Sequence, residues 1–215
     1  MHFILNLQIP EICETQNGKK QRKKSQFNKV DFFLYHCGLK FKIDMARIFL
    51  IGFMGSGKST YGKLMAQKLD MDFLDMDDYI EKKYSKSIYS LFDEWGEEQF
   101  RKEEKNVLRN LPVSDNLIIA TGGGTPCFFD NMEFMNKQGE TIYLRTSVRE
   151  LRDRLQHSNN KRPLLLDKSL KDLEVYIADL LTKREAFYLK SRYILDTDDL
   201  NPNNLISSWL ALKEI

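Results

Sequence analysis

The stretch GFMGSGKST, residues 52–60, follows directly after the apolar run Ile48–Ile51. It matches the pattern G-x-x-x-x-G-K-[S/T], in which glycines let backbone N–H groups approach the oxygens of a phosphate chain. A buried strand before such a loop and a helix after it are the expected context, because the helix N-terminus points its dipole at the anion. The stretch therefore predicts a phosphate-binding loop in which Lys58 reaches the β- and γ-phosphates and the Ser59 hydroxyl binds Mg²⁺.

Outward from this loop, short apolar runs alternate with segments of helical spacing. Strands separated by helices favour an α/β fold with a parallel sheet and right-handed crossovers. The runs expected to form strands are residues 47–51, 72–75, 116–121, 140–146 and 193–197. The segments expected to form helices are residues 58–69, 76–84, 87–111, 148–156, 170–190 and 203–212.

The length and composition indicate an ordinary globular protein. The chain has 215 residues, of which 42% are hydrophobic and 30% are charged, which suits one domain with an appendage. No apolar run approaches the roughly 18–20 residues that a membrane helix needs, and the opening residues do not form a signal peptide. The three cysteines are scattered, which favours a reducing, cytoplasmic environment.

The first 44 residues differ from the rest of the chain. They hold eight lysines and arginines against four acidic residues, and most of the basic ones fall in Gly18–Lys29. Such a run could bind nucleic acid or an anionic membrane, but a solvated tail is the commoner case. We expect residues 1–44 to be a disordered extension, and Met45 is a second candidate for the true start. The predicted domain then spans residues 45–215.

Two carboxylates follow the second predicted strand in the sequence FLDMDD. Ligands of open α/β sheets bind beyond the carboxyl ends of the strands, so Asp75 and Asp77 should face the same crevice as the phosphate loop. One carboxylate could hold a Mg²⁺-bound water, and the other could orient an acceptor hydroxyl. Acidic residues also favour helix N-termini, and position alone does not separate these two roles.

Three further segments carry arginines or glycines. Arg101 lies between Glu97 and Glu104, where a solvated ladder of ion pairs is the ordinary interpretation. TGGG, residues 121–124, could bring backbone N–H groups close to a ligand, although a flexible loop is more common. Arg162 lies in the polar stretch 157–169, where a lid that closes over the transferring phosphoryl group is expected.

In this order, the motifs of the chain resemble the shikimate kinase family. The resemblance runs from about Met45 to the C-terminus and is carried by GFMGSGKST, FLDMD, FRKEE, IIATGGG, KRPLL and REAFY. It implies a P-loop kinase with a five-stranded parallel sheet of order 2-3-1-4-5, flanking helices and a mobile lid. The implied reaction transfers the γ-phosphoryl group of ATP, with Mg²⁺, to the 3-hydroxyl of shikimate in aromatic amino-acid biosynthesis.

The resemblance also implies a role for each matching residue. Asp77 would bind the ring hydroxyls and accept a proton, and Arg101 with Arg184 would grip the substrate carboxylate. Lys58 and the lid arginine, Arg162, complete the catalytic set, and the metal would be held by Ser59 and Asp75. Implied ATP contacts are Gly55, Ser56, Gly57, Lys58, Ser59, Thr60, Arg154, Arg162, Asn201 and Pro202, with Asn201 in the place of a family arginine. Implied substrate contacts are Asp77, Phe92, Phe100, Arg101, Glu104, Gly122, Gly123, Gly124 and Arg184.

Two other functions fit parts of the pattern. A gluconate kinase or a nucleoside monophosphate kinase shares the phosphate loop, but F-R-x-x-E, GGG and R-P-L-L together argue against both. A nucleotide-binding module without catalysis could use the basic extension to hold RNA, but it would need no acceptor site. We therefore predict a cytoplasmic, monomeric enzyme whose partners are ATP and shikimate, without a nucleic-acid or membrane partner.

Overall fold

The computed structural model describes residues 30–33, 40–43, 47–112, 116–157, 169–198 and 200–213. Of the first 44 residues, it describes only β1 (Val30–Phe33) and β2 (Lys40–Ile43), which pair in antiparallel orientation. The remainder of the predicted extension lies outside the described residues. So does most of the predicted lid, residues 158–168, together with its arginine, Arg162.

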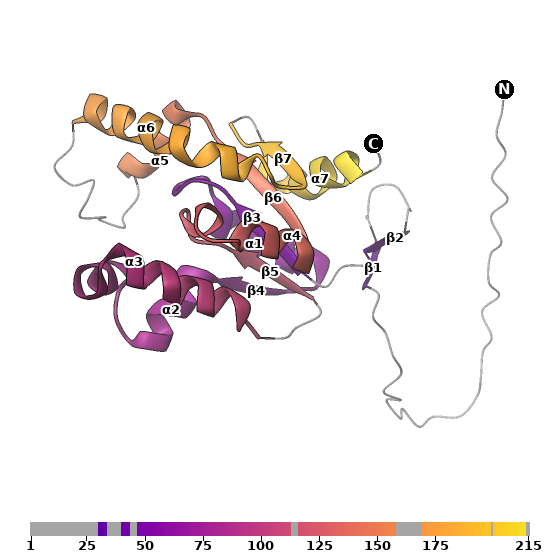
Figure 1. Ribbon diagram of the computed structural model, residues 1–215. Coiled ribbons are helices and arrows are strands. Elements are labelled where there is room, and N and C mark those ends of the chain that lie inside the picture. Colours follow the sequence, from indigo (N-terminus) through magenta and orange to yellow (C-terminus); the bar gives the residue numbers. More distant parts are fainter. Residues whose placement is uncertain are drawn as a thin grey trace, which may run out of the picture.

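Five parallel strands form the central sheet (Figure 1). Its spatial order is β4-β5-β3-β6-β7, which is 2-3-1-4-5 when these strands are counted along the chain. This order confirms the predicted topology. The strands are β3 (Arg47–Ile51), β4 (Asp72–Asp75), β5 (Leu117–Ala120), β6 (Glu140–Arg145) and β7 (Tyr193–Asp196).

Helices cover both faces of this sheet (Figure 1). Side chains alternate along β3, so Ile48 and Leu50 face one layer while Phe49 and Ile51 face the other. The first layer holds α1 and α7, and the second holds α2 to α6. The helices are α1 (Lys58–Leu69), α2 (Met76–Tyr84), α3 (Ile88–Arg109), α4 (Asn131–Gln138), α5 (Val148–His157), α6 (Leu170–Tyr188) and α7 (Leu205–Lys213).

The described structure differs from the expected elements at three places. A short 3₁₀ helix, η1 (Thr125–Cys127), and α4 occupy a segment to which the sequence analysis assigned no structure. The long α3 is not continuous, because Gly96 has φ 72° and ψ 169° and divides it into two helical pieces. The short 3₁₀ helix η3 (Pro202–Asn204) precedes α7.

The central position of β3 determines where a ligand can bind. The chain moves from β3 to β4 on one side of the sheet and later from β5 to β6 on the other, so the order reverses at β3. Ligands of open α/β sheets bind at such a switch point, beyond the carboxyl ends of the strands. The phosphate loop follows β3, Asp75 ends β4 and TGGG follows β5, so three of the predicted motifs lie at this edge.

Replacement of Trp209 tests the packing of α7 on the sheet. The indole is completely buried and meets the Tyr193 ring edge-on at 6.2 Å between centroids. We expect Trp209→Ala to lower the free energy of unfolding by about 3–5 kcal/mol, measured by urea denaturation. Val175→Ala, at a 54% exposed position on α6, is the control and should stay within about 0.5 kcal/mol of the wild type. Equal stability of both variants would contradict this packing.

Candidate active site

The phosphate loop joins β3 to α1 and depends on its glycines. Gly57 is the N-cap of α1 with φ 90°, and Gly55 has φ 83°, a left-handed conformation that most residues avoid. A Cβ atom at position 57 would also lie 2.8 Å from the Tyr61 ring. The loop can therefore present backbone N–H groups and the N-terminus of α1 to an anion.

Lys58 lies inside the curve of this loop. Its side chain is buried, and its Nζ donates to the carbonyl oxygens of Gly52 at 3.0 Å and Phe53 at 2.8 Å. These carbonyls hold the ammonium group at the mouth of the loop rather than in bulk solvent. A positive charge held in this position suits the terminal phosphates of a nucleotide.

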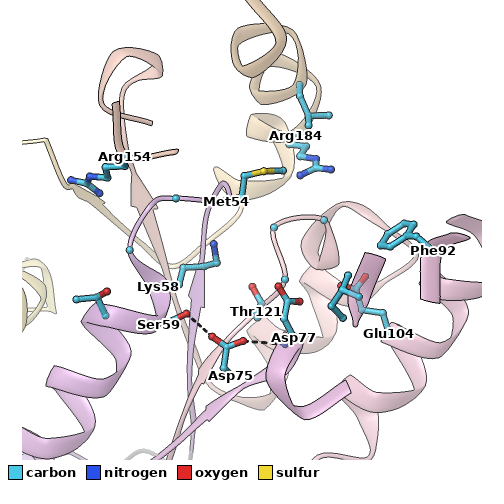
Figure 2. A pocket seen from close by; sticks show the side chains of 18 of the residues that line it. Met54, Lys58, Ser59, Asp75, Asp77, Phe92, Glu104, Thr121, Arg154 and Arg184 are labelled. Atoms are coloured by element: carbon cyan, nitrogen blue, oxygen red, sulfur yellow. Dashed lines mark hydrogen bonds between the residues drawn. The ribbon is translucent and has the colours of Figure 1, made fainter. Parts of the chain in front are cut away.

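Asp75 connects the phosphate loop to α2. One of its carboxylate oxygens accepts a hydrogen bond from Ser59 Oγ at 2.5 Å, and the other accepts the backbone N–H of Asp77 at 3.0 Å as the N-cap of α2 (Figure 2). This cap places Asp77 in the first turn of α2, on the side of the cleft. The role of Asp75 as a helix cap is therefore observed, and it does not compete with a role at the cleft.

The Ser59 and Asp75 pair offers oxygen ligands of the kind that Mg²⁺ prefers. Mg²⁺ usually keeps several waters and takes one or two protein ligands beside the phosphates of a substrate. Within the described part of the chain, no group of three or more His, Cys, Asp or Glu residues could hold a metal by itself. The pair thus fits a nucleotide-bound Mg²⁺, and it does not form a metal site made of protein ligands alone.

Arg101 is buried rather than part of a solvated ladder. Only 7% of the residue is exposed, and its Nη1 donates to Glu104 at 2.9 Å. Glu104 is 2% exposed and also accepts the Thr125 hydroxyl at 2.6 Å. Glu97, on the exposed side, accepts from Arg101 at 3.3 Å. The ordinary interpretation of this charged helix as a solvated face is therefore wrong at Arg101 and Glu104.

Aromatic rings complete the environment of the Arg101 guanidinium. Its Cζ lies 5.2 Å from the centroid of Phe92, 5.4 Å from Phe100 and 4.4 Å from Phe128. Phe92 and Phe100 also stack on each other at 4.1 Å. Rings at these distances attract a cation and exclude water from it. The guanidinium is thus fixed in an orientation that a planar carboxylate could meet.

The three glycines after β5 are surrounded by charged groups on several sides. A Cβ atom at position 122 would lie 2.7 Å from Glu104 Oε1, and one at position 124 would lie 2.5 Å from Arg101 Nη2. At position 123 it would lie 3.5 Å from Arg184 Nη1. Close approach therefore requires glycine at positions 122 and 124, and Arg101 and Arg184 lie against neighbouring residues of this short loop.

A single cleft of about 860 Å³ joins these groups. Figure 2 shows Lys58, Asp77 and Arg184 around it, on three different elements. The predicted residues that line the cleft are Gly55, Gly57, Lys58, Ser59, Thr60, Asp75, Asp77, Phe92, Phe100, Arg101, Glu104, Gly122, Gly123, Gly124, Arg154, Arg184 and Pro202. Of the predicted residues that the structure describes, two do not line it: Ser56, a completely buried residue of the loop, and Asn201.

One end of the cleft is bounded by Arg154 and Pro202. Arg154, on α5, donates from Nε to Glu150 at 2.8 Å and from Nη2 to the Thr197 carbonyl at 3.3 Å. The Asn201 side chain accepts the backbone N–H of Asn203 at 2.9 Å and so caps η3. Asn201 thus supports the turn that presents Pro202.

Several lining residues were not predicted from the sequence. Met54 lies within the phosphate-loop motif, and Thr121 immediately precedes the three glycines, so proximity to a motif could have indicated both. Ile88, Tyr176 and Leu180 are apolar residues on helices, which the sequence does not distinguish from core residues. Phe128 does not line the cleft and lies behind Arg101.

Cys127 lies near the two arginines but does not have the character of a nucleophile. Burial raises the pKa of its thiol to about 11, although the positive charges of Arg184 and Arg101 act in the opposite direction. A thiol with this pKa is protonated at neutral pH and reacts slowly. We therefore assign it no part in the chemistry.

The comparison with protein families shows to which family the chain belongs. The family described as "Shikimate kinase" matches residues 54–213, which includes the phosphate loop from Met54, both carboxylates and both arginines. The chain belongs to the shikimate kinase family. This membership confirms the resemblance inferred from the motifs and disfavours a gluconate kinase or a nucleotide-binding module without catalysis.

Relatives of known name agree with the family. A shikimate kinase of Parabacteroides distasonis is 46% identical over 73% of this chain and 90% of its own length. The crystal structure of shikimate kinase from Bacteroides thetaiotaomicron has a TM-score of 0.76 and 41% identity, covering 80% of this chain and 99% of that one. A shikimate kinase from Acinetobacter baumannii, solved in complex with shikimate, has a TM-score of 0.71 and 33% identity, covering 79% and 93%.

Replacement of Arg101 tests its place in the acceptor site of this shikimate kinase family member. We expect Arg101→Ala to lower kcat/KM for shikimate by at least about 30-fold, mainly through KM, because the buried guanidinium that is predicted to bind the carboxylate is lost. ATP binding, measured by calorimetry, should change little. Lys102→Ala removes the neighbouring, exposed lysine, which pairs only at the surface with Glu98, and should behave as the wild type. Unchanged shikimate kinetics in Arg101→Ala would remove its assigned role.

Proposed function

We propose that this protein transfers the γ-phosphoryl group of ATP to the 3-hydroxyl of shikimate, giving shikimate 3-phosphate and ADP. The observation that supports this most strongly is the arrangement of the cleft. A phosphate-binding loop with Lys58 lies at one part of it, and a buried arginine, Arg101, lies with Arg184 against the glycine loop at another. An enzyme that transfers a phosphoryl group from a nucleotide to a hydroxyl group of a carboxylic acid needs both.

The acceptor is held by groups that match its chemistry. Shikimate carries one carboxylate and several hydroxyls, and arginine can pair with a carboxylate through two parallel hydrogen bonds. Arg101 and Arg184 would bind the carboxylate, with the backbone of Gly123 and Gly124 beside it. Asp77, in the first turn of α2, would bind the ring hydroxyls and accept the proton of the attacking one.

ATP, the phosphoryl donor, requires neutralisation of its phosphate charge more than covalent chemistry by the protein. Phosphoryl transfer depends on alignment and on positive charge around the transferring group. Lys58 and the backbone N–H groups of the loop would bind the phosphates, and Arg162 would close over them from the lid. Ser59 and Asp75 would hold Mg²⁺, directly and through water, and the ion would neutralise phosphate charge when the nucleotide is bound. The adenine would lie against Arg154, Pro202 and the turn that Asn201 caps.

The cellular location and the partners of the enzyme are proposed from the sequence. The scattered cysteines favour the cytoplasm, and the near-neutral charge of the domain gives no reason to expect a nucleic-acid partner. None of the helices in the described ranges has the length and apolar character that crossing a membrane requires. We further propose that the enzyme acts as a monomer and that residues 1–44 take no part in catalysis.

An ADP-release assay tests the proposed reaction. The purified chain is given ATP and Mg²⁺ with shikimate, gluconate or AMP in parallel, and ADP is measured over time. We expect turnover with shikimate only, because the two arginines and Asp77 match a carboxylate and hydroxyls on one ring. Turnover with gluconate or AMP, and none with shikimate, would replace the proposed acceptor while leaving the phosphate loop in its role.

Replacement of Asp77 separates a catalytic role from a structural role in the first turn of α2. We expect Asp77→Asn to lower kcat by about 10²–10⁴-fold, since the amide cannot accept the hydroxyl proton, while far-UV circular dichroism stays unchanged. Asp78→Asn is the matched control, because Asp78 also lies in the first turn of α2 but is exposed and outside the cleft. A near-normal kcat for Asp77→Asn would reduce Asp77 to a structural residue of α2.

Removal of the metal tests the pair formed by Ser59 and Asp75. We expect EDTA to abolish turnover and added Mg²⁺ to restore it. Asp75→Ala should raise the Mg²⁺ concentration needed for half-maximal rate by about tenfold or more, because a ligand or water-holding group is lost. A variant with an unchanged Mg²⁺ requirement would show that Asp75 only caps α2.

A further inference from the structure

Tyr188 ends α6 one turn after Arg184 and is completely buried. Residues four apart lie on the same face of a helix, so the phenol and the guanidinium project from α6 toward the same region. The Tyr188 hydroxyl donates a hydrogen bond to the carbonyl oxygen of Gly123 at 2.5 Å. This bond joins two segments 65 residues apart in the chain.

The carbonyl that Tyr188 binds belongs to the loop that carries the acceptor site. Gly123 lines the cleft, and a Cβ atom added there would lie 3.5 Å from Arg184 Nη1. Tyr188 itself does not line the cleft. Its hydroxyl therefore contacts the site from behind, at the point where α6 and the glycine loop meet.

The phenol has the protonation state that this contact requires. Burial raises the pKa of Tyr188, and the positive charge of Arg184 lowers it by a smaller amount. The hydroxyl therefore keeps its proton throughout the physiological range and can donate it to the Gly123 carbonyl.

Packing alone does not explain the hydroxyl. The Tyr188 ring lies against the Tyr143 ring at 5.2 Å between centroids, and a phenylalanine would preserve this contact. A buried hydroxyl lowers stability unless it is hydrogen-bonded, so its partners indicate what it does. Here the partner, the Gly123 carbonyl, belongs to the proposed carboxylate-binding region, beside Arg184.

We propose that Tyr188 is a positioning residue for the acceptor: its hydroxyl ties the glycine loop to the face of α6 that carries Arg184. The tie fixes the position of Arg184 relative to Gly123 and Gly124, and Gly124 in turn lies against Arg101. A carboxylate can then meet both guanidinium groups at once. This inference rests on the proposed function.

Tyr188→Phe removes only the hydroxyl and so tests the tie. We expect KM for shikimate to rise by about tenfold, with kcat and KM for ATP changed less than about twofold, because carboxylate binding serves ground and transition states alike. Tyr143→Phe is the matched control. Tyr143 is equally buried, packs on the same ring and donates only a long bond of 3.4 Å to Glu185. An unchanged KM for shikimate in Tyr188→Phe, or equal rises for shikimate and ATP, would overturn the proposal.

A second measurement does not depend on turnover. Hydrogen exchange followed by mass spectrometry should show faster exchange of the peptide containing residues 121–124 in Tyr188→Phe than in the wild type or Tyr143→Phe. Exchange that is unchanged would overturn the tie. If the wild-type protein does not phosphorylate shikimate, the proposed function is overturned, and so is the role of Tyr188 in binding the acceptor. The exchange measurement would still decide whether the Tyr188 hydroxyl holds the glycine loop.

A double-mutant cycle tests whether Tyr188 affects KM for shikimate through Arg184. In an Arg184→Ala background, Tyr188→Phe should raise KM for shikimate by less than it does in the wild type, because the group that it positions is already absent. Additive effects of the two substitutions would show that Tyr188 does not act through Arg184, and would overturn that part of the inference.

Discussion

The close approach of charged groups to three consecutive glycines is the constraint on which the site depends. The loop after β5 has no side chains at positions 122–124, and each position is contacted by a different charged residue: Glu104, Arg184 and Arg101. A methyl group added at position 122 would displace Glu104, and one added at position 124 would displace Arg101. Because the loop is this thin, groups from α3 and α6, which flank it, can reach one small region of the cleft.

The parallel sheet brings this loop beside the phosphate loop. Both follow neighbouring strands, β5 and β3, and both lie beyond the carboxyl ends of those strands. The distribution of charge then follows from the sheet order: a buried lysine lies in the curve of the phosphate loop, and arginines lie at the glycine loop. Asp77 follows the end of β4, and β5 lies between β4 and β3 in the sheet. A nucleotide and a carboxylate acceptor can thus occupy one cleft with a carboxylate group between them.

The sequence predicted the sheet and the phosphate loop because both follow from local patterns. Glycine spacing defines the loop, and continuous apolar runs define strands that are covered on both faces. Burial of Arg101 was not predictable in this way, since its neighbours Glu97 and Glu104 form an ordinary helical charge pattern, and only the rings of Phe92 and Phe128 show otherwise. Helix α4 was missed although the parallel order requires a crossover between β5 and β6. Tyr188 was part of a recognised motif, yet its partner Gly123 is distant in sequence and emerges only in the fold.

A crystal structure of the protein with shikimate and ADP tests the central claim most directly. We expect the shikimate carboxylate to lie within hydrogen-bonding distance of both Arg101 and Arg184, beside the glycine loop, with its ring hydroxyls directed toward Asp77. We expect the ADP phosphates to lie in the loop around Lys58. Shikimate bound elsewhere, with Arg101 still paired only to Glu104 and Glu97 and Arg184 turned to solvent, would contradict the account.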